Sequence, residues 1–570
     1  SGSSTNSFNN VSITGSLTAP SANMNVAGNW SNSGTFNANS GTVTFNGAST
    51  YTIKSGSSSF NNITFNNASG KWSLTDNLTA SNDLTLTAGT IDIGATNLTV
   101  NGTYTQGNGS TLALTANSSS AYGSITSSVA ADVNSGSTVN VTVGGYIPNN
   151  ATLTIVDTGG SGIGSAPSTV TSSNSFVAFA AASSGGNLVL TANRAANGFS
   201  SVANNSNAAA VGNALDNITN PTADMTTVLD TLSGLSDGQV ASSEDTMSPP
   251  DDRGAVDASN NTLSQFVGTT IVRLQDSKVE EDKAAAAIDA PLKNDIWAQS
   301  YGDYAQQGKR GVSNGYLARL WGIVVGIDHV FMDNTLRLGF AQGFGWSRIR
   351  SKDNGGRTGI SSYQSGLYGE YQGKDSPYII DAVLTYGYND YNSSRNVVIG
   401  SINRTASSDY DGQQFSTYLE GGYKIKSKDL DIIPLLALSY AHLHVSGYTE
   451  TGAGSMNLNV DAQNYDNLQL GAGCRFTRHF EGLNAIFTPE VHFRYFYSVI
   501  NDKQQSLASF TGGGTSFQTS GFRPAPSSFN FGGRLELFNK KNITLLVTCD
   551  TVFKEGYYEA GGSLVAKYSF

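Results

Sequence analysis

The sequence predicts an all-β chain made of two unlike parts: an N-terminal parallel β-helix, or solenoid, and a C-terminal 12-stranded antiparallel transmembrane β-barrel with a pore helix. Gly, Ser, Thr and Asn dominate the 570 residues, and aromatic residues make up 10%. Short β-branched runs, each followed by turn residues, recur through about the first 200 residues. From Asn294 onward, about twelve segments of roughly 10 to 16 residues alternate apolar and polar side chains, which is typical of strands between lipid and a wet lumen.

Composition narrows the function classes. Mean hydropathy is -0.21 and no apolar run reaches about 18 residues, which excludes a transmembrane helix but not alternating strands. The net charge of -11 disfavours nucleic acid as a partner. Cys474 and Cys549, at predicted lipid-facing positions, are expected to be small apolar side chains rather than a disulfide. The first residues, SGSSTNSF, carry no charged or apolar leader, so we expect a mature or trimmed form.

Residues 1–120 are expected to form the solenoid passenger, with a truncated passenger as an open alternative. Runs such as Thr42-Val43-Thr44-Phe45 place apolar side chains at every second position. SFNNVSI from Ser7 resembles SFNNITF from Ser59, a spacing that fits two or three coils. A disordered low-complexity segment is the alternative, although regular β-branched runs are not typical of disorder.

Residues 121–199 are expected to cap the solenoid, because a terminal coil must cover an otherwise open sheet edge. Residues 200–255 are predicted to be a helical linker. There Met225, Val228, Leu229 and Leu232 lie at helical spacing, and the Pro249-Pro250 cluster is expected to end that helix. Residues 256–290 are predicted to hold the pore-spanning helix, strongest from Val256 to Asp276, with polar groups nearly all round.

Residues 291–570 are predicted to be the barrel. Trp321, Ile323 and Val325 alternate with Gly322 and Val324, and later segments alternate in the same way. A soluble β-sandwich would also alternate, with the charged face outward. Aromatic residues at the strand ends favour the membrane alternative. The inward set, predicted to line a lumen of mixed charge, is Arg337, Glu370, Asp381, Glu420, Arg475, Glu490, Arg494, Arg534, Glu536, Asp550 and Lys567.

This order of elements resembles the classical, monomeric autotransporters of outer membranes. The most specific segments are LSGLSDGQ (232–239), NDIWAQSYGDY (294–304), RLWGIVVGIDHVF (319–331) and LVAKYSF (564–570), while AYGSI (121–125) resembles the family's autochaperone junction. The resemblance implies a barrel that translocates its own passenger and anchors it at the cell surface. It implies periplasmic chaperones and the barrel-assembly machinery as partners, with Tyr568 and Phe570 in the assembly signal, and outer-membrane lipid around the barrel.

Some family members cleave themselves between two adjacent Asn of the pore helix, and Asn260-Asn261 lies in the matching segment. The alternative is a pair of solvated lumenal amides. His442 and His444 share a strand face, but no third metal ligand is spaced nearby, so neither a metal nor a cofactor is expected. No nucleophile elbow, phosphate loop or HExxH motif occurs.

Three functions remain open. The first is a secreted and displayed passenger that acts in adhesion or self-association, with a host or neighbouring cell surface as partner. The second is a passive outer-membrane pore with a structural N-terminal domain. The third, a surface hydrolase, is disfavoured because residues 1–200 contain neither His nor Cys.

Overall fold

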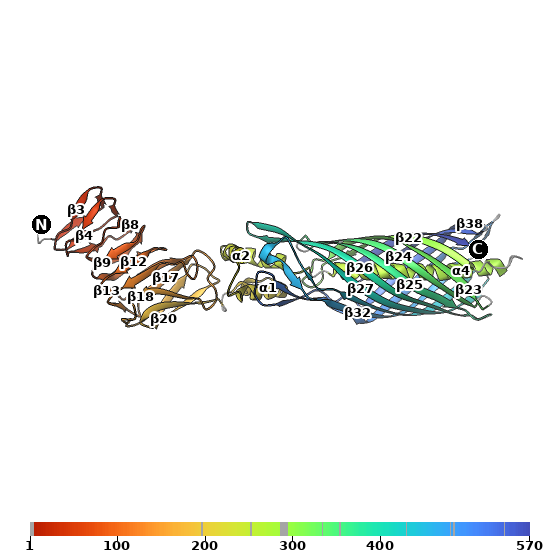
Figure 1. The fold of residues 1–570 in the computed structure, drawn as a ribbon. Coiled ribbons are helices and arrows are strands. Elements are labelled where there is room, and N and C mark those ends of the chain that lie inside the picture. The colour runs from red at the N-terminus through yellow and green to blue at the C-terminus, as the bar shows by residue number, and fades with distance from the viewer. Residues whose placement is uncertain are drawn as a thin grey trace. The chain divides into compact units, whose positions relative to one another are not determined.

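The computed structural model describes the chain except for residues 1–4, 195–197, 251–252, 286–293, 333–334, 353–354, 375, 429, 479, 483–484 and 541. The chain divides into two compact units. The first comprises Ser1–Asn204, Val211–Ala241 and Gly513–Thr515, and the second comprises Asn205–Ala210, Ser242–Gly512 and Ser516–Phe570. Figure 1 shows the solenoid of the first unit and the barrel of the second.

The solenoid is a parallel β-helix, as predicted. Its strands are β1 (Asn6–Phe8), β2 (Val11–Ile13), β3 (Ser16–Thr18), β4 (Met24–Val26), β5 (Trp30–Asn32), β6 (Thr35–Asn37), β7 (Thr42–Phe45), β8 (Thr50–Lys54), β9 (Asn62–Leu74), β10 (Leu78–Ala80), β11 (Leu84–Asp92), β12 (Asn97–Val100), β13 (Thr103–Gln106), β14 (Thr111–Ala116), β15 (Ser124–Ser127), β16 (Ala130–Val133), β17 (Thr138–Val143), β18 (Thr152–Asp157) and β19 (Thr169–Ser172). Parallel pairing joins each coil to the next, for example β4 to β7 and β7 to β9.

Stacked side chains fill the coils. Phe45 and Phe65 lie parallel with ring centroids 5.2 Å apart, and Trp72 follows at 5.1 Å from Phe65. The sequence repeat is not a register repeat, because Ser7 aligns with Asn25, Thr44 and Thr64 rather than with Ser59. Coils therefore repeat by backbone geometry, and the SFNN similarity does not mark equivalent positions.

Two antiparallel strands and a helix close the C-terminal end of the solenoid. The strands are β20 (Ala178–Ser184) and β21 (Asn187–Asn193), and β21 pairs with β18. The four apolar residues predicted to share a helical face are all buried on α2 (Ala223–Ser233). The predicted end at Pro249-Pro250 is wrong: α2 ends before Gly234, and a separate helix, α3 (Asp237–Met247), follows. Upstream lie η1 (Phe199–Val202) and α1 (Ser206–Asp216).

A buried arginine lies between two aromatic rings at the C-terminal end of the solenoid. The Arg194 guanidinium lies between the rings of Tyr146 and Phe199, 4.7 Å and 4.6 Å from their centroids. Burial lowers the pKa of Arg194 and raises that of Tyr146. Tyr146 donates its hydroxyl to the carbonyl of Ile218 at 3.0 Å, and its backbone N–H to Asp230 at 2.5 Å. Tyr146 therefore fixes α2 against the last coils.

Replacing Tyr146 by phenylalanine is expected to destabilise this end by about 1 to 2 kcal/mol, because the buried Ile218 carbonyl would lose its partner. The loss of stability is measured by heating the full chain and monitoring the unfolding of α2 through its sensitivity to protease. Tyr51→Phe is the matched control, since the Tyr51 hydroxyl donates to no residue that the structure describes. Equal behaviour of the two variants would argue against this contact as an anchor.

The barrel is a closed sheet of twelve antiparallel strands, as predicted. They are β22 (Asn294–Gln307), β23 (Tyr316–Phe331), β24 (Leu336–Ser351), β25 (Arg357–Tyr371), β26 (Tyr378–Ile399), β27 (Ile402–Tyr423), β29 (Leu430–Val445), β32 (Gln463–Arg478), β35 (Glu490–Asn501), β38 (Ser527–Lys540), β39 (Ile543–Lys554) and β40 (Tyr557–Ser569). Each strand pairs with the next, and β40 closes the barrel on β22. Short strands β28 (Ile425–Ser427), β33 (Phe480–Gly482) and β34 (Ala485–Phe487) lie in turns.

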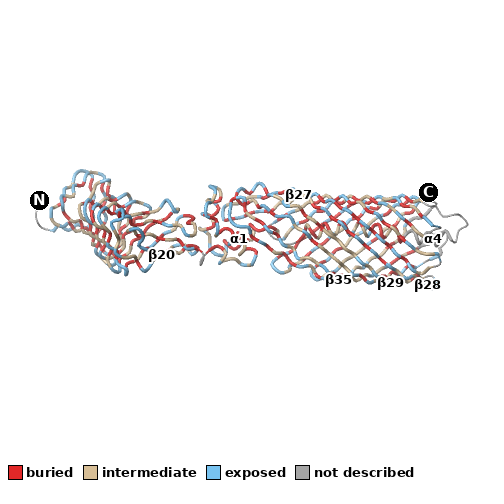
Figure 2. The backbone as a smooth tube through the Cα atoms, turned by 60° about the horizontal axis from the view of Figure 1, so that its bottom comes forward, coloured by how far each residue is buried: buried red, intermediate tan, exposed pale blue. Residues whose placement is uncertain are grey.

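The apolar face of the barrel strands points outward. Trp321 is 58% exposed and Leu367 60%, whereas Arg475 is 2% exposed. Buried and exposed residues alternate along the strands in Figure 2. The soluble sandwich alternative is therefore wrong, because its charged side chains would face solvent and its aromatic side chains would be enclosed.

Helix α4 (Gly254–Ala285) lies inside the barrel, against β23, β24, β25 and β26 (Figure 1). It begins two residues before the predicted Val256, and part of the predicted 256–290 segment lies outside the described residues. Among the described helices, none is long and apolar enough to cross a membrane.

The barrel has two distinguishable ends. At one, called the entry end here, α4 begins: Arg253 donates to the carbonyl of Asp502 at 2.6 Å, and Tyr316 to Asp257 at 2.9 Å. At the other, called the far end, Phe570 and Asn294 exchange two backbone hydrogen bonds. The entry end also carries a small sheet of β30 (Tyr448–Thr449), β31 (Leu458–Val460), β36 (Gln505–Phe510) and β37 (Phe517–Ser520), and the turn η2 (Gly454–Met456).

Candidate functional site

The predicted lumen-lining residues all lie on the inward side of the strands. Glu420 pairs with Arg494 at 3.3 Å, and Glu490 pairs with Arg534 at 3.1 Å. Asp550 contacts His492 at 2.9 Å. The full set comprises eight buried residues and three half-buried ones, the latter being Arg494, Glu536 and Asp550; the buried ones are Arg337, Glu370, Asp381, Glu420, Arg475, Glu490, Arg534 and Lys567.

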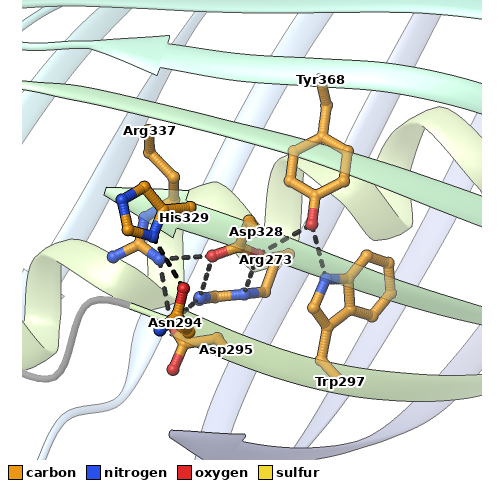
Figure 3. A network of polar contacts seen from close by, with 8 residues as sticks. All are labelled: Arg273, Asn294, Asp295, Trp297, Asp328, His329, Arg337 and Tyr368. Atoms are coloured by element: carbon orange, nitrogen blue, oxygen red, sulfur yellow. Dashed lines mark hydrogen bonds and ion pairs between the residues drawn. The ribbon is translucent and has the colours of Figure 1, made fainter. Parts of the chain in front are cut away.

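A charged network near the far end holds α4 to the wall (Figure 3). Arg273 of α4, 1% exposed, donates to the two oxygens of Asp328 at 2.9 Å and 2.8 Å and also contacts Asp295. Arg337 donates to Asp295 at 2.9 Å and also contacts Asp328. Two arginines thus neutralise two carboxylates from neighbouring strands, an arrangement that a buried charge requires.

Tyr368 completes the network from the next strand. Its hydroxyl donates to Asp328 at 2.8 Å and accepts from the indole N–H of Trp297 at 2.6 Å. Of the four charged residues, only Arg337 was in the predicted lumenal set. The sequence could have identified Asp328 as lumenal, because it has the same strand parity as Gly322 and Gly326. Its pairing with Arg273, in contrast, depends on how far α4 is inserted.

The middle of α4 packs into a recess made by glycines. A Cβ at Gly343 would lie 2.6 Å from the Phe266 ring, and one at Gly366 would lie 2.5 Å from it. Any larger residue at either position would have to displace the ring. Phe266 is fully buried, so shape as well as charge fixes the helix in the lumen.

Asn260 and Asn261 line a lumenal cavity of about 270 Å³. Asn261 donates to the Tyr557 hydroxyl at 2.7 Å, and Tyr557 donates to Glu559 at 2.5 Å. Asn260 accepts from Gln414 at 3.1 Å through its amide oxygen. The carboxylates of Asp303, Asp550 and Glu559 line the same cavity, so acidic groups surround the asparagine pair.

Stacked tyrosines lie at the entry end. The ring of Tyr410 lies 4.8 Å from Tyr391 and 4.3 Å from Tyr448, nearly parallel to both. Tyr391 also hydrogen-bonds Ser259 of α4 at 2.7 Å. Within the described part of the chain, no group of three or more His, Cys, Asp or Glu could hold a metal ion. The arrangement supports the holding of a helix inside the lumen.

A closed barrel with an apolar outer face, a charged lumen and a helix held inside defines an integral outer-membrane protein. Residues 296–550 match the family model of the autotransporter beta-domain. This match identifies the barrel as an autotransporter beta-domain, and it supports secretion through an outer-membrane barrel.

Curated relatives share part of the chain. It is 24% identical to outer membrane protein A of Rickettsia rickettsii over 344 residues, covering 57% of this chain and 15% of that protein. It is 28% identical to esterase EstA of Pseudomonas aeruginosa over 218 residues, covering 38% of this chain and 32% of that protein. The chain therefore spans under one third of the length of either relative.

Among solved structures, the translocator domain of the autotransporter NalP from Neisseria meningitidis is similar. The identity is 13%, the match covers 54% of this chain and 98% of that chain, and the TM-score is 0.40.

Proposed function

We propose that the barrel carries the preceding solenoid to the cell surface and anchors it there, and that the solenoid acts in adhesion or self-association. The observation that carries the second part is a set of in-register polar columns on the solenoid. Asn25, Thr44, Thr64, Thr85 and Thr105 align through parallel pairing. A second column holds Thr90, Thr111, Thr138 and Thr169.

These columns suit many weak contacts. Parallel strands lie about 4.8 Å apart, so each column repeats a hydroxyl or amide at that spacing. A single such contact is weak, but simultaneous contacts raise the overall affinity steeply. Residues 1–194 contain only eight charged side chains, two of which pair as Lys71–Asp92 at 2.9 Å, so little charge opposes the approach of another surface.

Cells that express the chain test both parts. Protease added outside should remove residues 1–200, and the cells should settle faster than cells that express the barrel alone. Thr44→Lys with Thr85→Lys should abolish settling, because like charges would then repel, while the shaving pattern stays unchanged. The matched control is Thr79→Lys with Thr99→Lys, on the separate column of β10 and β12. Protected residues 1–200 would contradict surface display, and unchanged settling would contradict the adhesive face.

For assembly we propose Tyr568 and Phe570 as the signal that the barrel-assembly machinery reads, with periplasmic chaperones acting before it. Both side chains are exposed, and their rings lie 6.2 Å apart. Phe570→Ala should lower the amount of folded barrel in the membrane, whereas exposed Met332→Ala should not. Heat-modifiable mobility on gels measures the folded fraction.

A self-cleavage of α4 would break the bond after Asn260. The side-chain amide nitrogen of Asn260 would attack the main-chain carbonyl carbon of the same residue and lose a proton. The bond from that carbon to the backbone nitrogen of Asn261 would break, and the proton would pass to this leaving amine. Asn260 would then end the N-terminal fragment as a succinimide. Asn261 is the poorer nucleophile, because its amide nitrogen already donates to Tyr557. Mass spectrometry of the purified barrel should find a new N-terminus at Asn261, lost in Asn260→Ala and kept in Asn261→Ala. An uncut wild-type chain would end this proposal.

The other two functions have less support. A passive pore requires an open lumen, whereas α4 occupies this one. A hydrolase would need catalytic groups in the passenger, yet all five histidines lie at or after His329.

A further inference from the structure

Four arginines gather on the outer face of the barrel, at the entry end of three neighbouring strands. They are Arg319 of β23, Arg348 and Arg350 of β24, and Arg357 of β25, and all four are exposed. Arg319 has the parity of lipid-facing Trp321, while Leu320 between them is buried in the lumen. The guanidinium groups therefore face away from the lumen, in a patch that we call the arginine patch.

The patch contains two pairs of arginines, and the two arginines of each pair lie directly opposite each other on neighbouring strands. Arg319 is in register with Arg348, and Arg350 is in register with Arg357. Opposed Cβ atoms of antiparallel strands lie about 4.5 to 5.5 Å apart, and like charges there destabilise a sheet. No described residue forms an ion pair with any of the four, although the chain carries a net charge of -11. The nearest outward carboxylate in register with Arg319 and Arg348 is Asp409, two strands beyond the patch on β27, while Asp390 and Asp411 lie in the register of Trp321 and Trp346.

The position along the strands places this patch just beyond the apolar band. Trp321 and Trp346 stack with centroids 4.3 Å apart, one step below Arg319 and Arg348. About ten residues, at roughly 3.3 Å each, separate Trp321 from exposed Phe331 along β23. Because barrel strands tilt by about 40°, this length covers about 25 Å along the barrel axis, which is the height of an outer-membrane apolar band. Trp321 and Phe331 thus mark its two boundaries, and the arginines lie at the level of lipid headgroups.

We propose that the arginine patch binds the phosphate groups of a lipid in the outer leaflet of the membrane. Guanidinium groups bind phosphate oxygens through paired N–H donors, and a phosphate between two opposed arginines would remove their repulsion. Trp321 and Trp346 would pack against the sugar or glycerol and the first methylenes of the same lipid. The choice of the outer leaflet rests on the proposed surface display, because the solenoid precedes α4 in the chain and α4 begins at the entry end. The proposal that the patch binds lipid does not depend on surface display.

Purified full-length chain in neutral detergent tests the site. The probe is bisphosphorylated lipid A, compared with the same lipid after removal of its phosphates, with affinity read by native mass spectrometry. We expect the bisphosphorylated lipid to bind at least about tenfold more tightly, and the triple variant R319Q/R348Q/R350Q to bind it roughly 100-fold more weakly than wild type. The contrast should shrink at 0.5 M salt.

The matched control removes three exposed cations at the far end, K426Q/K428Q/R478Q, and should keep the wild-type affinity. Gel mobility before and after heating checks that both triple variants are folded. Equal affinity for the two lipids, or equal loss in both triple variants, would overturn the site. Displacement of the lipid by millimolar inorganic phosphate would assign the patch to free phosphate instead. Failure of surface display with lipid binding intact would reassign only the leaflet.

Discussion

Replacing Arg273 by methionine is expected to loosen α4 and raise the conductance of the barrel. Arg273 is almost fully buried, and its removal would leave Asp295 and Asp328 with Arg337 as their shared cation, and with Lys567 near Asp295 alone. Removing one partner from a buried ionic group typically costs about 3 to 5 kcal/mol, because a desolvated charge is left uncompensated. We expect frequent openings in planar-bilayer recordings, against rare ones in the wild-type chain.

A second variant separates charge from packing in this experiment. R273M/D295N removes one cation and one carboxylate together, so the remaining Arg337 and Asp328 balance. Its conductance should return toward the wild-type level, while R273M alone should also expose α4 to added protease. If R273M conducts like the wild-type chain, Phe266 in its glycine recess and not the ionic network holds the helix.

The barrel could be predicted in detail because one short-range rule governs each strand. Alternate side chains must face opposite sides, so the identity of Trp321 and Gly322 already tells which side each occupies. The rule assigned lumenal positions such as Arg475 and Glu490 without any knowledge of strand pairing. It depends only on the sequence within a strand, and its phase shifts at a β-bulge such as those between Leu468 and Gln469 and between Glu536 and Phe538.

The helix contacts were not predictable in the same way. Arg273 meets Asp295 and Asp328 only at one depth and rotation of α4, which no local pattern fixes. The arginine patch was missed for the opposite reason: the parity rule treats every outward residue as lipid-facing, although Arg319 and Arg348 lie beyond the apolar band. Similarly, α2 ends before Gly234, a residue of low helix propensity, well upstream of the prolines that the sequence predicts as its end.

Replacing Phe45 by alanine is expected to unfold the first coils of the solenoid while leaving the later ones intact. The Phe45 side chain is fully buried, with the Phe65 ring at 5.2 Å and those of Trp30 and Phe60 at 6.2 Å. Loss of a core phenylalanine costs about 3 to 5 kcal/mol, because a cavity remains where the ring was.

The effect should stay local, since each coil contacts only its neighbours and stability in such folds adds along the axis. Limited proteolysis of Phe45→Ala should therefore cut before about residue 65 and spare the segment from β11 to β21, whose coils keep all their own contacts. Thr44→Ala, on the outward face of the same strand, is the control and should leave the digestion pattern unchanged. Digestion of the whole solenoid in Phe45→Ala would mean that its coils unfold together, so that even one N-terminal defect would remove every polar column from the proposed adhesive face.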